Sequence, residues 1–196
     1  MPRDRNAVST LWPKVGQNVQ VPYEIDVLLV KDRITDITEA LAMISGKTCI
    51  KFHQRTVETD YMYFSYGEGC ASYVGFLGGE QSIVVGQTCR PGNICHEILH
   101  ALGLYHEHSR LDRDQYITIL SENIIPGKEK NFLAKDGNTL GLQYDLESIL
   151  HYGNNYFSSN GGPTIVSKDS SVTIGQRTRL TALDVQKIRK LYQCAV

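Results

Sequence analysis

The sequence lacks the features that mark membrane-spanning, nucleic-acid-binding and repeat proteins. Its longest apolar stretches, such as residues 25–30, fall far short of the roughly 20 residues that span a bilayer. The formal net charge is −1, so no basic excess is available for nucleic acid or an anionic membrane. No internal repeat, low-complexity segment or Asn-x-Ser/Thr sequon occurs, and N-glycosylation is not expected. With 196 residues, 41% of them apolar, the chain suits one globular domain.

A signal peptide is also missing, because no apolar core follows the first five residues, Met-Pro-Arg-Asp-Arg. The chain is then either a processed or recombinant fragment, or a protein that is not exported. The five cysteines bear on this choice: Cys49, Cys70, Cys89, Cys95 and Cys194. Their number is odd, so at least one is free or pairs outside the chain, and the spacing alone leaves the connectivity open.

Apolar spacing predicts strands in the first half of the chain and helices at its middle and end. Strands are expected at residues 21–30, 49–54, 61–66 and 82–85. Helices are expected over about 34–44 with a stop at Gly46, to about residue 102 from an N-cap at Asn93, and over 180–192 with an N-cap at Thr181. The rest of the second half is rich in loops and glycine. This pattern predicts an α+β fold with a cleft where the two halves meet.

The segment that begins at His96 predicts a metal site. His96 and His100 are four residues apart, a rotation of about 400° on an α-helix, so both imidazoles lie on one face and can reach a single ion. Glu97 projects about 100° away, close enough to act on a metal-bound water without binding the ion itself. A continuous helix would turn His106 about 240° away from His100. Gly103 can end the helix and fold the chain back, which makes His106 the expected third ligand.

These histidines could also have roles that do not involve a metal. A single histidine is more often a surface or hydrogen-bonded core residue than a ligand, and a bare His-Glu-x-x-His recurs by chance. Gly103 and His106 at fixed offsets make the whole pattern far more specific. The remaining histidines are expected to be structural: His53, His108 and His151.

The segment at residues 96–110, HEILHALGLYHEHSR, resembles the signature of the astacin family of metzincin zinc metalloproteases. Similar landmarks occur in the family's order at residues 48–52, 69–70, 109–116, 148–153, 174–177 and 191–194. The resemblance covers the chain from about residue 6 to residue 194. It implies a two-lobed catalytic domain, with an N-terminal lobe of sheet and helices over about 6–103 and a loop-rich C-terminal lobe over about 104–196.

The same resemblance implies an activity and a cofactor. The protein would be a secreted zinc metalloendopeptidase that hydrolyses peptide bonds of extracellular proteins, with one Zn²⁺ per chain. His96, His100 and His106 would hold the zinc, and Glu97 would be the general base for the zinc-bound water. Tyr152 matches the family tyrosine that is an extra zinc ligand at rest and swings away to hydrogen-bond the oxyanion; the alternative is a buried packing tyrosine.

The resemblance also implies two disulfides, Cys49 with Cys194 and Cys70 with Cys89. Cys95 is then unpaired and is expected to be a small buried apolar residue rather than a redox or inhibitory thiol. Both bridges imply an oxidising compartment, so the missing signal peptide is interpreted as removed.

Residues 1–5 resemble the remainder of a zymogen propeptide or a segment added for expression, with an activation boundary between Arg5 and Asn6. In the family, the glutamate after the third ligand, here Glu107, anchors the new amino terminus, which Asn6 would supply. If residues 1–5 are still attached, that contact cannot form as such.

Substrate recognition is predicted at three places. Arg177 aligns with the family arginine that lines the pocket for the residue after the cut, and Lys128 falls where some members add a second basic residue, so acidic side chains would be preferred there. Lys128 is equally compatible with a solvated surface lysine. Residues 82–85 are expected to be the edge strand that takes the substrate by strand addition, through Ser82 and Val84. Leu150 departs from the family methionine beneath the zinc, and we expect activity to survive this volume-conserving change.

Two competing functions use the same residues. A zinc-containing extracellular binding module without catalysis would have lost the general base or the third ligand, and both are present. A purely structural zinc site would need four protein ligands and no open position. Expected partners are extracellular proteins or peptides, without nucleic acid or membrane insertion. The sequence is compatible with a monomeric domain and leaves the oligomeric state open.

Overall fold

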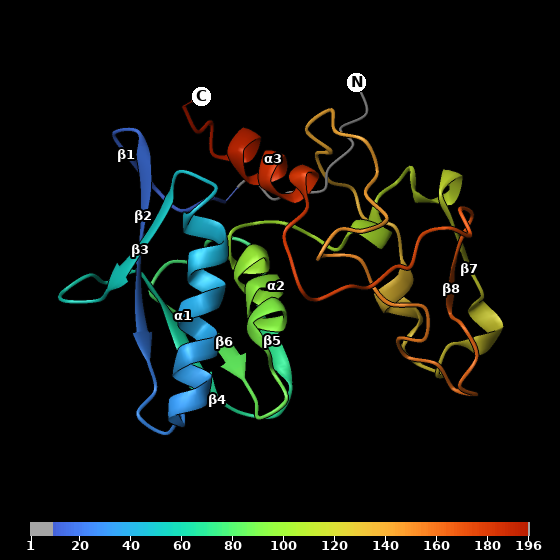
Figure 1. The fold of residues 1–196 in the computed structure, drawn as a ribbon, viewed down its shortest axis with the longest axis horizontal. Coiled ribbons are helices and arrows are strands. Elements are labelled where there is room, and N and C mark those ends of the chain that lie inside the picture. The colour runs from blue at the N-terminus through green and yellow to red at the C-terminus, as the bar shows by residue number, and fades with distance from the viewer. Residues whose placement is uncertain (1–9, 196) are drawn as a thin grey trace.

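Residues 10–195 are described by a computed structural model of the chain, and their first half is built around one mixed sheet (Figure 1). Its strands are β1 (Lys14–Val15), β2 (Asn18–Ile25), β3 (Ile50–Gln54), β4 (Tyr61–Tyr66), β5 (Cys70–Ser72) and β6 (Glu80–Val85). They follow the order β1-β2-β4-β6-β5, and β3 also pairs with β2. The pairings of β2 with β3, β2 with β4 and β4 with β6 are parallel, whereas β1 and β5 run antiparallel to their neighbours.

Two helices, α1 (Lys31–Ser45) and α2 (Pro91–Ala101), lie side by side against one face of this sheet (Figure 1). The predicted helix near residue 34 is confirmed, with Gly46 as its C-cap. Alternation along β4 and β6 turns Met62, Phe64, Ile83 and Val85 into the core, where all four are fully buried. Covering these side chains from one side places α2 in the interior of the molecule.

Helix α2 is buried along most of its length, since every residue from position 94 to position 101 is inaccessible or nearly so. It begins one turn earlier than predicted: Pro91 is its first residue and Arg90 its N-cap, so the N-cap expected at Asn93 is wrong. Asn93 is instead the third residue of the helix, and its side-chain oxygen accepts the backbone N–H of the N-cap Arg90 at 3.1 Å. Pro91 is favoured at this first position because its missing N–H would be unsatisfied anyway.

The second half is loop-rich, as expected, with one short antiparallel pair of strands and several single turns. These elements are η1 (Glu107–Ser109), η2 (Arg113–Gln115), β7 (Ile117–Ile119), η3 (Ser121–Asn123), η4 (Glu129–Phe132), β8 (Ile165–Ser167) and α3 (Ala182–Leu191). Helix α3 has the predicted N-cap, since Thr181 Oγ1 accepts the Asp184 N–H at 2.9 Å. The α+β prediction is therefore confirmed.

Helix α3 packs back onto the first core and also contacts the loop at residues 148–150. Ile188 is fully buried there together with Ile149 and Leu150, and the Tyr192 hydroxyl donates to the Leu102 carbonyl at 2.9 Å. A second, smaller apolar core lies under the β7–β8 pair and includes Phe132, Tyr144 and Tyr152. The lobe boundary near residue 103 remains a prediction, because the first core contains residues from before and after this position.

Both expected disulfides are present, Cys49–Cys194 and Cys70–Cys89, and Cys95 is unpaired and fully buried. The first joins the end of α3 to the start of β3 across 145 positions. Burial raises the pKa of the Cys95 thiol, which keeps it protonated and inert. Among residues 10–195, no helix is both long and apolar enough to cross a bilayer.

Two predictions about strands are wrong. The strand expected over 21–30 ends at Ile25, because Asp26 starts a turn in which its side chain accepts the Leu28 N–H at 2.9 Å. The segment with Ser82 and Val84 is not an edge strand, since β6 is paired with β4 on one side and β5 on the other. On this side of the sheet the edge strand is β5, which pairs only with β6.

Candidate metal centre

Three histidines converge where α2 meets the second half of the chain. His96 and His100 come from successive turns of α2, and His106 follows after Gly103, whose φ of 102° lets the chain turn back. The three Nε2 atoms lie 3.0–3.1 Å from one another. A tetrahedral zinc ion bound at about 2.0–2.1 Å would hold such nitrogens roughly 3.3 Å apart, so they are close to the spacing of three ligands.

Hydrogen bonds on the far side of two rings show which nitrogen faces this point. His96 Nδ1 donates to the Ile149 carbonyl and His100 Nδ1 donates to the Leu104 carbonyl, both at 2.7 Å. Each of these neutral rings therefore presents the bare lone pair of Nε2 to the other. Two lone pairs that face each other at about 3 Å repel unless a cation lies between them. Three imidazole nitrogens with a fourth position left open are a ligand set typical of zinc.

Burial keeps these imidazoles uncharged near neutral pH. It lowers the pKa of His100 to about 4 and holds the pKa values of His96 and His106 well below their usual range, where the neighbouring imidazoles add to the effect. Neutral imidazole is the form that binds a metal ion. The protein environment thus keeps the three imidazoles in the protonation state that could bind a metal ion.

The same shifts predict that the metal-free protein loses stability as the pH falls from about 6.5 toward 4. Folding lowers the pKa of His100 and His151 to about 4 and that of His108 to about 3, from 6.5. The unfolded chain therefore binds protons first, and each such histidine costs up to about 1.4 kcal/mol per pH unit below 6.5. Burial raises the pKa of Glu97 from 4.5 to about 7 and also raises the pKa of Asp145, so both carboxyls act in the opposite direction. They are two groups against five histidines whose pKa values burial lowers.

Urea unfolding of the chelator-treated protein at about pH 7 and about pH 5 measures this effect. His151→Gln removes one buried imidazole outside the three converging histidines and should make the decline shallower. A free energy of unfolding that is equal or higher at the lower pH contradicts the prediction.

Glu97 lies beside the three histidines in the same cleft, a cavity of about 400 Å³. It comes from α2, one residue after His96, and is 8% exposed. Burial raises the pKa of its carboxyl to about 7, and the charge of Arg177 opposes the shift. A carboxyl with this pKa can both accept and deliver a proton near neutral pH.

Tyr152 lines the cleft from the other side. Its ring lies 4.5 Å from the His106 ring and stacks on His108 at 3.9 Å between centroids. Burial raises the pKa of its phenol to about 12, so the hydroxyl stays protonated and can donate a hydrogen bond. The stacking on His108 shows that this structural histidine supports Tyr152 from behind.

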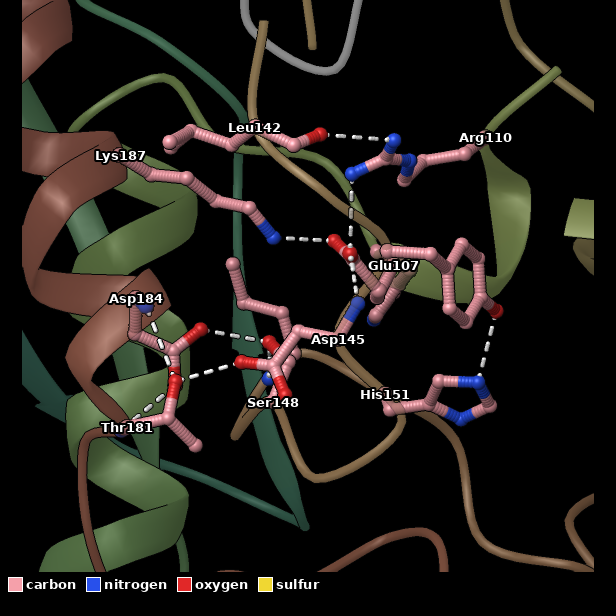
Figure 2. A network of polar contacts seen from close by, with 12 residues as sticks. Glu107, Arg110, Leu142, Asp145, Ser148, His151, Thr181, Asp184 and Lys187 are labelled. Atoms are coloured by element: carbon pink, nitrogen blue, oxygen red, sulfur yellow. Dashed lines mark hydrogen bonds and ion pairs between the residues drawn. The ribbon is translucent and has the colours of Figure 1, made fainter. Parts of the chain in front are cut away.

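The floor of the site is a turn that includes Leu150. Leu150 is fully buried in the first core. The expectation that activity survives a leucine at this position stays a prediction. The turn is held from α3: Asp184 accepts the Ser148 hydroxyl at 2.6 Å and the Ile149 N–H at 3.0 Å (Figure 2). Because the Ile149 carbonyl accepts the hydrogen bond from His96, Asp184 supports His96 through a single residue, Ile149.

Sequence reasoning did not identify Ser148 or Asp184 as part of the site. The Thr181-x-x-Asp184 capping box was readable, but the second set of contacts of Asp184 lies 35 and 36 positions away. Gly92 was also missed: a Cβ atom there would come within 1.8 Å of the Arg177 carbonyl oxygen. Only glycine lets the Arg177 backbone pack on the first turn of α2.

The predicted recognition residues differ in where they lie. Arg177 lines the cleft, and its guanidinium donates to the His151 carbonyl at 2.9 Å. Lys128 is exposed at the start of η4 and is not among the residues that line the cleft. Ser82 and Val84 line a neighbouring hollow together with Ala71, Ser72 and Tyr73, beside the edge strand β5. Glu107 is fully buried, and Asn6 lies outside the described residues.

Comparisons with known proteins give consistent matches. The family model described as Astacin, a peptidase family, matches residues 4–193. The zinc metalloproteinase nas-14 of Caenorhabditis elegans is 43% identical over 94% of this chain and 37% of its own length. An astacin-like metalloendopeptidase of Gallus gallus is 42% identical over 98% of this chain and 49% of its own length. The chain thus spans less than half of either of these relatives.

A solved structure is also similar over its whole length. High choriolytic enzyme 1, a hatching enzyme zinc-protease from Oryzias latipes, superposes with a TM-score of 0.93 at 38% identity, over 97% of this chain and 100% of that one.

Proposed function

Because the chain belongs to the astacin family of peptidases, we propose that it hydrolyses peptide bonds within extracellular proteins, with zinc held by His96, His100 and His106. The membership confirms the predicted enzyme class, a zinc metalloendopeptidase, and Zn²⁺ as its cofactor. The observation that carries the assignment of residues is the convergence of three imidazole Nε2 atoms beside a buried carboxyl in one cleft. Zinc, when bound, would supply Lewis-acid chemistry, which makes water a nucleophile near neutral pH.

Glu97 is the general base in this proposal. Its carboxylate accepts a proton from the attacking water, and the resulting carboxylic acid delivers that proton to the leaving amine. A pKa near 7 suits both steps, because the two protonation states are then close in free energy. The burial that raises this pKa also excludes other water from the carboxyl group.

Tyr152 is proposed to stabilise the oxyanion of the tetrahedral intermediate. Its hydroxyl is protonated at neutral pH and lines the same cleft as Glu97. A donor that is already oriented, here by the stack on His108, stabilises developing charge without reorganisation during the reaction. Its role as an additional zinc ligand at rest stays a prediction.

The substrate is proposed to add as an extended strand to β5. This strand has β6 on only one side, and Ala71 and Ser72 line the cleft that holds the histidines. Unpaired backbone groups at a sheet edge are suited to bind a peptide main chain. Ser82 and Val84 would then contact substrate side chains from β6, the strand next to β5, instead of pairing with the substrate backbone.

Arg177 is proposed to favour acidic residues just after the cleaved bond. Replacing it by glutamine is expected to lower the preference for Asp or Glu over Ala at that position by roughly 10- to 100-fold, since hydrogen bonds to charged groups are worth about 1.5–3 kcal/mol. A peptide library with one varied position measures the effect. Arg179→Gln, an exposed arginine that pairs with Glu147, is the matched control. A wild-type profile without enrichment of Asp or Glu contradicts this proposal for Arg177 and the sequence-based prediction for Lys128.

Two further proposals concern the origin of the chain. The two disulfides support secretion into an oxidising compartment. Glu107 is proposed to anchor the amino terminus that activation before Asn6 would create. Recovery of the protein from the culture medium tests secretion. Sequencing its amino terminus tests the anchor, since a mature chain that begins elsewhere than at Asn6 excludes it.

Cleavage products of an unfolded protein substrate test the main proposal. An endopeptidase yields internal fragments, and a zinc chelator abolishes them. Folded, zinc-loaded protein that binds the substrate without cutting it would instead support the alternative, a catalytically impaired binding module.

A further inference from the structure

Helix α3 places a lysine inside the protein, next to the segment that carries His106. Lys187 is 1% exposed, and its ammonium pairs with the carboxylate of Glu107, which is fully buried (Figure 2). We propose that Lys187 is a positioning residue for His106 and acts through Glu107. This inference rests on the proposed role of His106 as a metal ligand.

The two carboxylate oxygens of Glu107 have different partners. Oε2 pairs with Lys187, while Oε1 accepts the Asp145 N–H at 2.9 Å and an Arg110 N–H at 3.2 Å. The backbone N–H of Glu107 donates to the Leu150 carbonyl in the floor turn at 3.1 Å. A residue held at its side chain and its main chain has little freedom to rotate. Since Glu107 directly follows His106, these contacts fix the peptide unit that sets the direction of the ligand.

The charges around this point make Lys187 hard to replace. Glu107, Asp145 and Asp184 bring three buried carboxyl groups together, and within residues 10–195 Arg110 and Lys187 are buried basic residues that face them. Arg110 divides its hydrogen bonds among Glu107, Asp112 and two carbonyl oxygens. Lys187 is directed at Glu107 from α3. Removing its charge lowers the positive charge that compensates these carboxylates, and the segment must shift in response.

The experiment measures how fast zinc leaves the protein when a chromogenic chelator is added in excess. Lys187→Met removes the charge at similar length, and release is expected to be roughly 10- to 100-fold faster, the usual effect of losing a residue that orients a metal ligand. Lys190→Met is the matched control, because this lysine lies on the exposed side of the same helix and contacts the Leu140 carbonyl instead. Its release rate should equal that of the wild type.

A second pair of variants separates positioning from loss of folding. Ile188→Val removes a methyl group from the core beside Lys187 and lowers stability without touching Glu107. The double variant Lys187→Met/Glu107→Gln removes both charges of the pair, so it should release zinc more slowly than Lys187→Met alone. If Lys187→Met does not fold, the double variant is compared with Glu107→Gln alone. The effect of Lys187→Met on the zinc release rate is then measured in the Glu107→Gln background. There it should be smaller than the 10- to 100-fold acceleration expected when Glu107 is present.

The outcomes are distinct. Release from Lys187→Met at the wild-type rate overturns the inference, as does an acceleration no larger than that of Ile188→Val at equal stability. A double variant that releases zinc as fast as Lys187→Met shows that the effect does not pass through Glu107, which also overturns it. A wild-type protein that binds no zinc would instead refute the proposed ligands.

Discussion

Replacing Glu97 by glutamine is expected to lower kcat/KM for peptide hydrolysis by roughly 10²- to 10⁴-fold, the usual contribution of a positioned general base. The amide has nearly the same shape as the carboxyl, but it cannot accept the proton of the attacking water. Glu97 lies in the cleft with the three histidines and is 8% exposed, and the similar shape of glutamine lets the substitution fit without moving a neighbour. Zinc should remain bound, because Glu97 is not one of the three converging residues.

Zinc content and hydrolysis should therefore be measured on the same sample. The exposed Glu122 of η3 offers a control, and Glu122→Gln should keep wild-type activity. A Glu97→Gln protein with full zinc and full activity refutes the assignment of the base. Loss of both zinc and activity would point to a structural role for Glu97 instead.

Removing the Cys49–Cys194 bridge is expected to have the largest effect on stability. The bridge closes a loop of 145 positions, whereas Cys70–Cys89 closes one of 19. In the chain-entropy model the longer loop contributes about 5 kcal/mol and the shorter about 3 kcal/mol. The long bridge also holds the end of α3, whose Asp184 and Lys187 support the floor turn and the third histidine.

Urea unfolding of the zinc-loaded double variants Cys49→Ala/Cys194→Ala and Cys70→Ala/Cys89→Ala measures both effects. The first variant should be less stable than the second and should also release zinc faster than the wild type. A larger loss of stability from the shorter bridge would contradict the account, since it would show that loop closure is not the main contribution.

The parts of the site that could be predicted from sequence are those fixed by local geometry. His96, Glu97 and His100 lie on one helix, where a spacing of four decides the shared face, and Gly103 supplies the turn that returns His106. Periodicity likewise predicted the burial of Ile37, Leu41 and Ile44 in α1, because one face of a helix repeats every three to four residues. Ile34, on the same predicted face, is 40% exposed.

The parts that could not be predicted depend on contacts between distant segments. Nothing near Lys187 in the sequence shows that it is buried against Glu107, 80 positions away. The strand at this edge, β5, is only three residues long, which is too short to show an alternating pattern. The sequence pattern therefore favours the longer β6 as the edge strand. The close approach at Gly92 was hidden for a similar reason, since its partner Arg177 belongs to a loop near the other end of the chain.

The most direct test of the central claim is a zinc titration of the metal-free protein, with hydrolysis of a quenched fluorescent peptide as the readout. Three histidines that hold one ion beside Glu97 predict activity that is absent without metal, rises in proportion to added zinc and levels off at one zinc per chain. The His106→Ala variant should need much more zinc or stay inactive. Activity that persists in the chelated protein, or a fully zinc-loaded protein that never cleaves the peptide, would contradict the account.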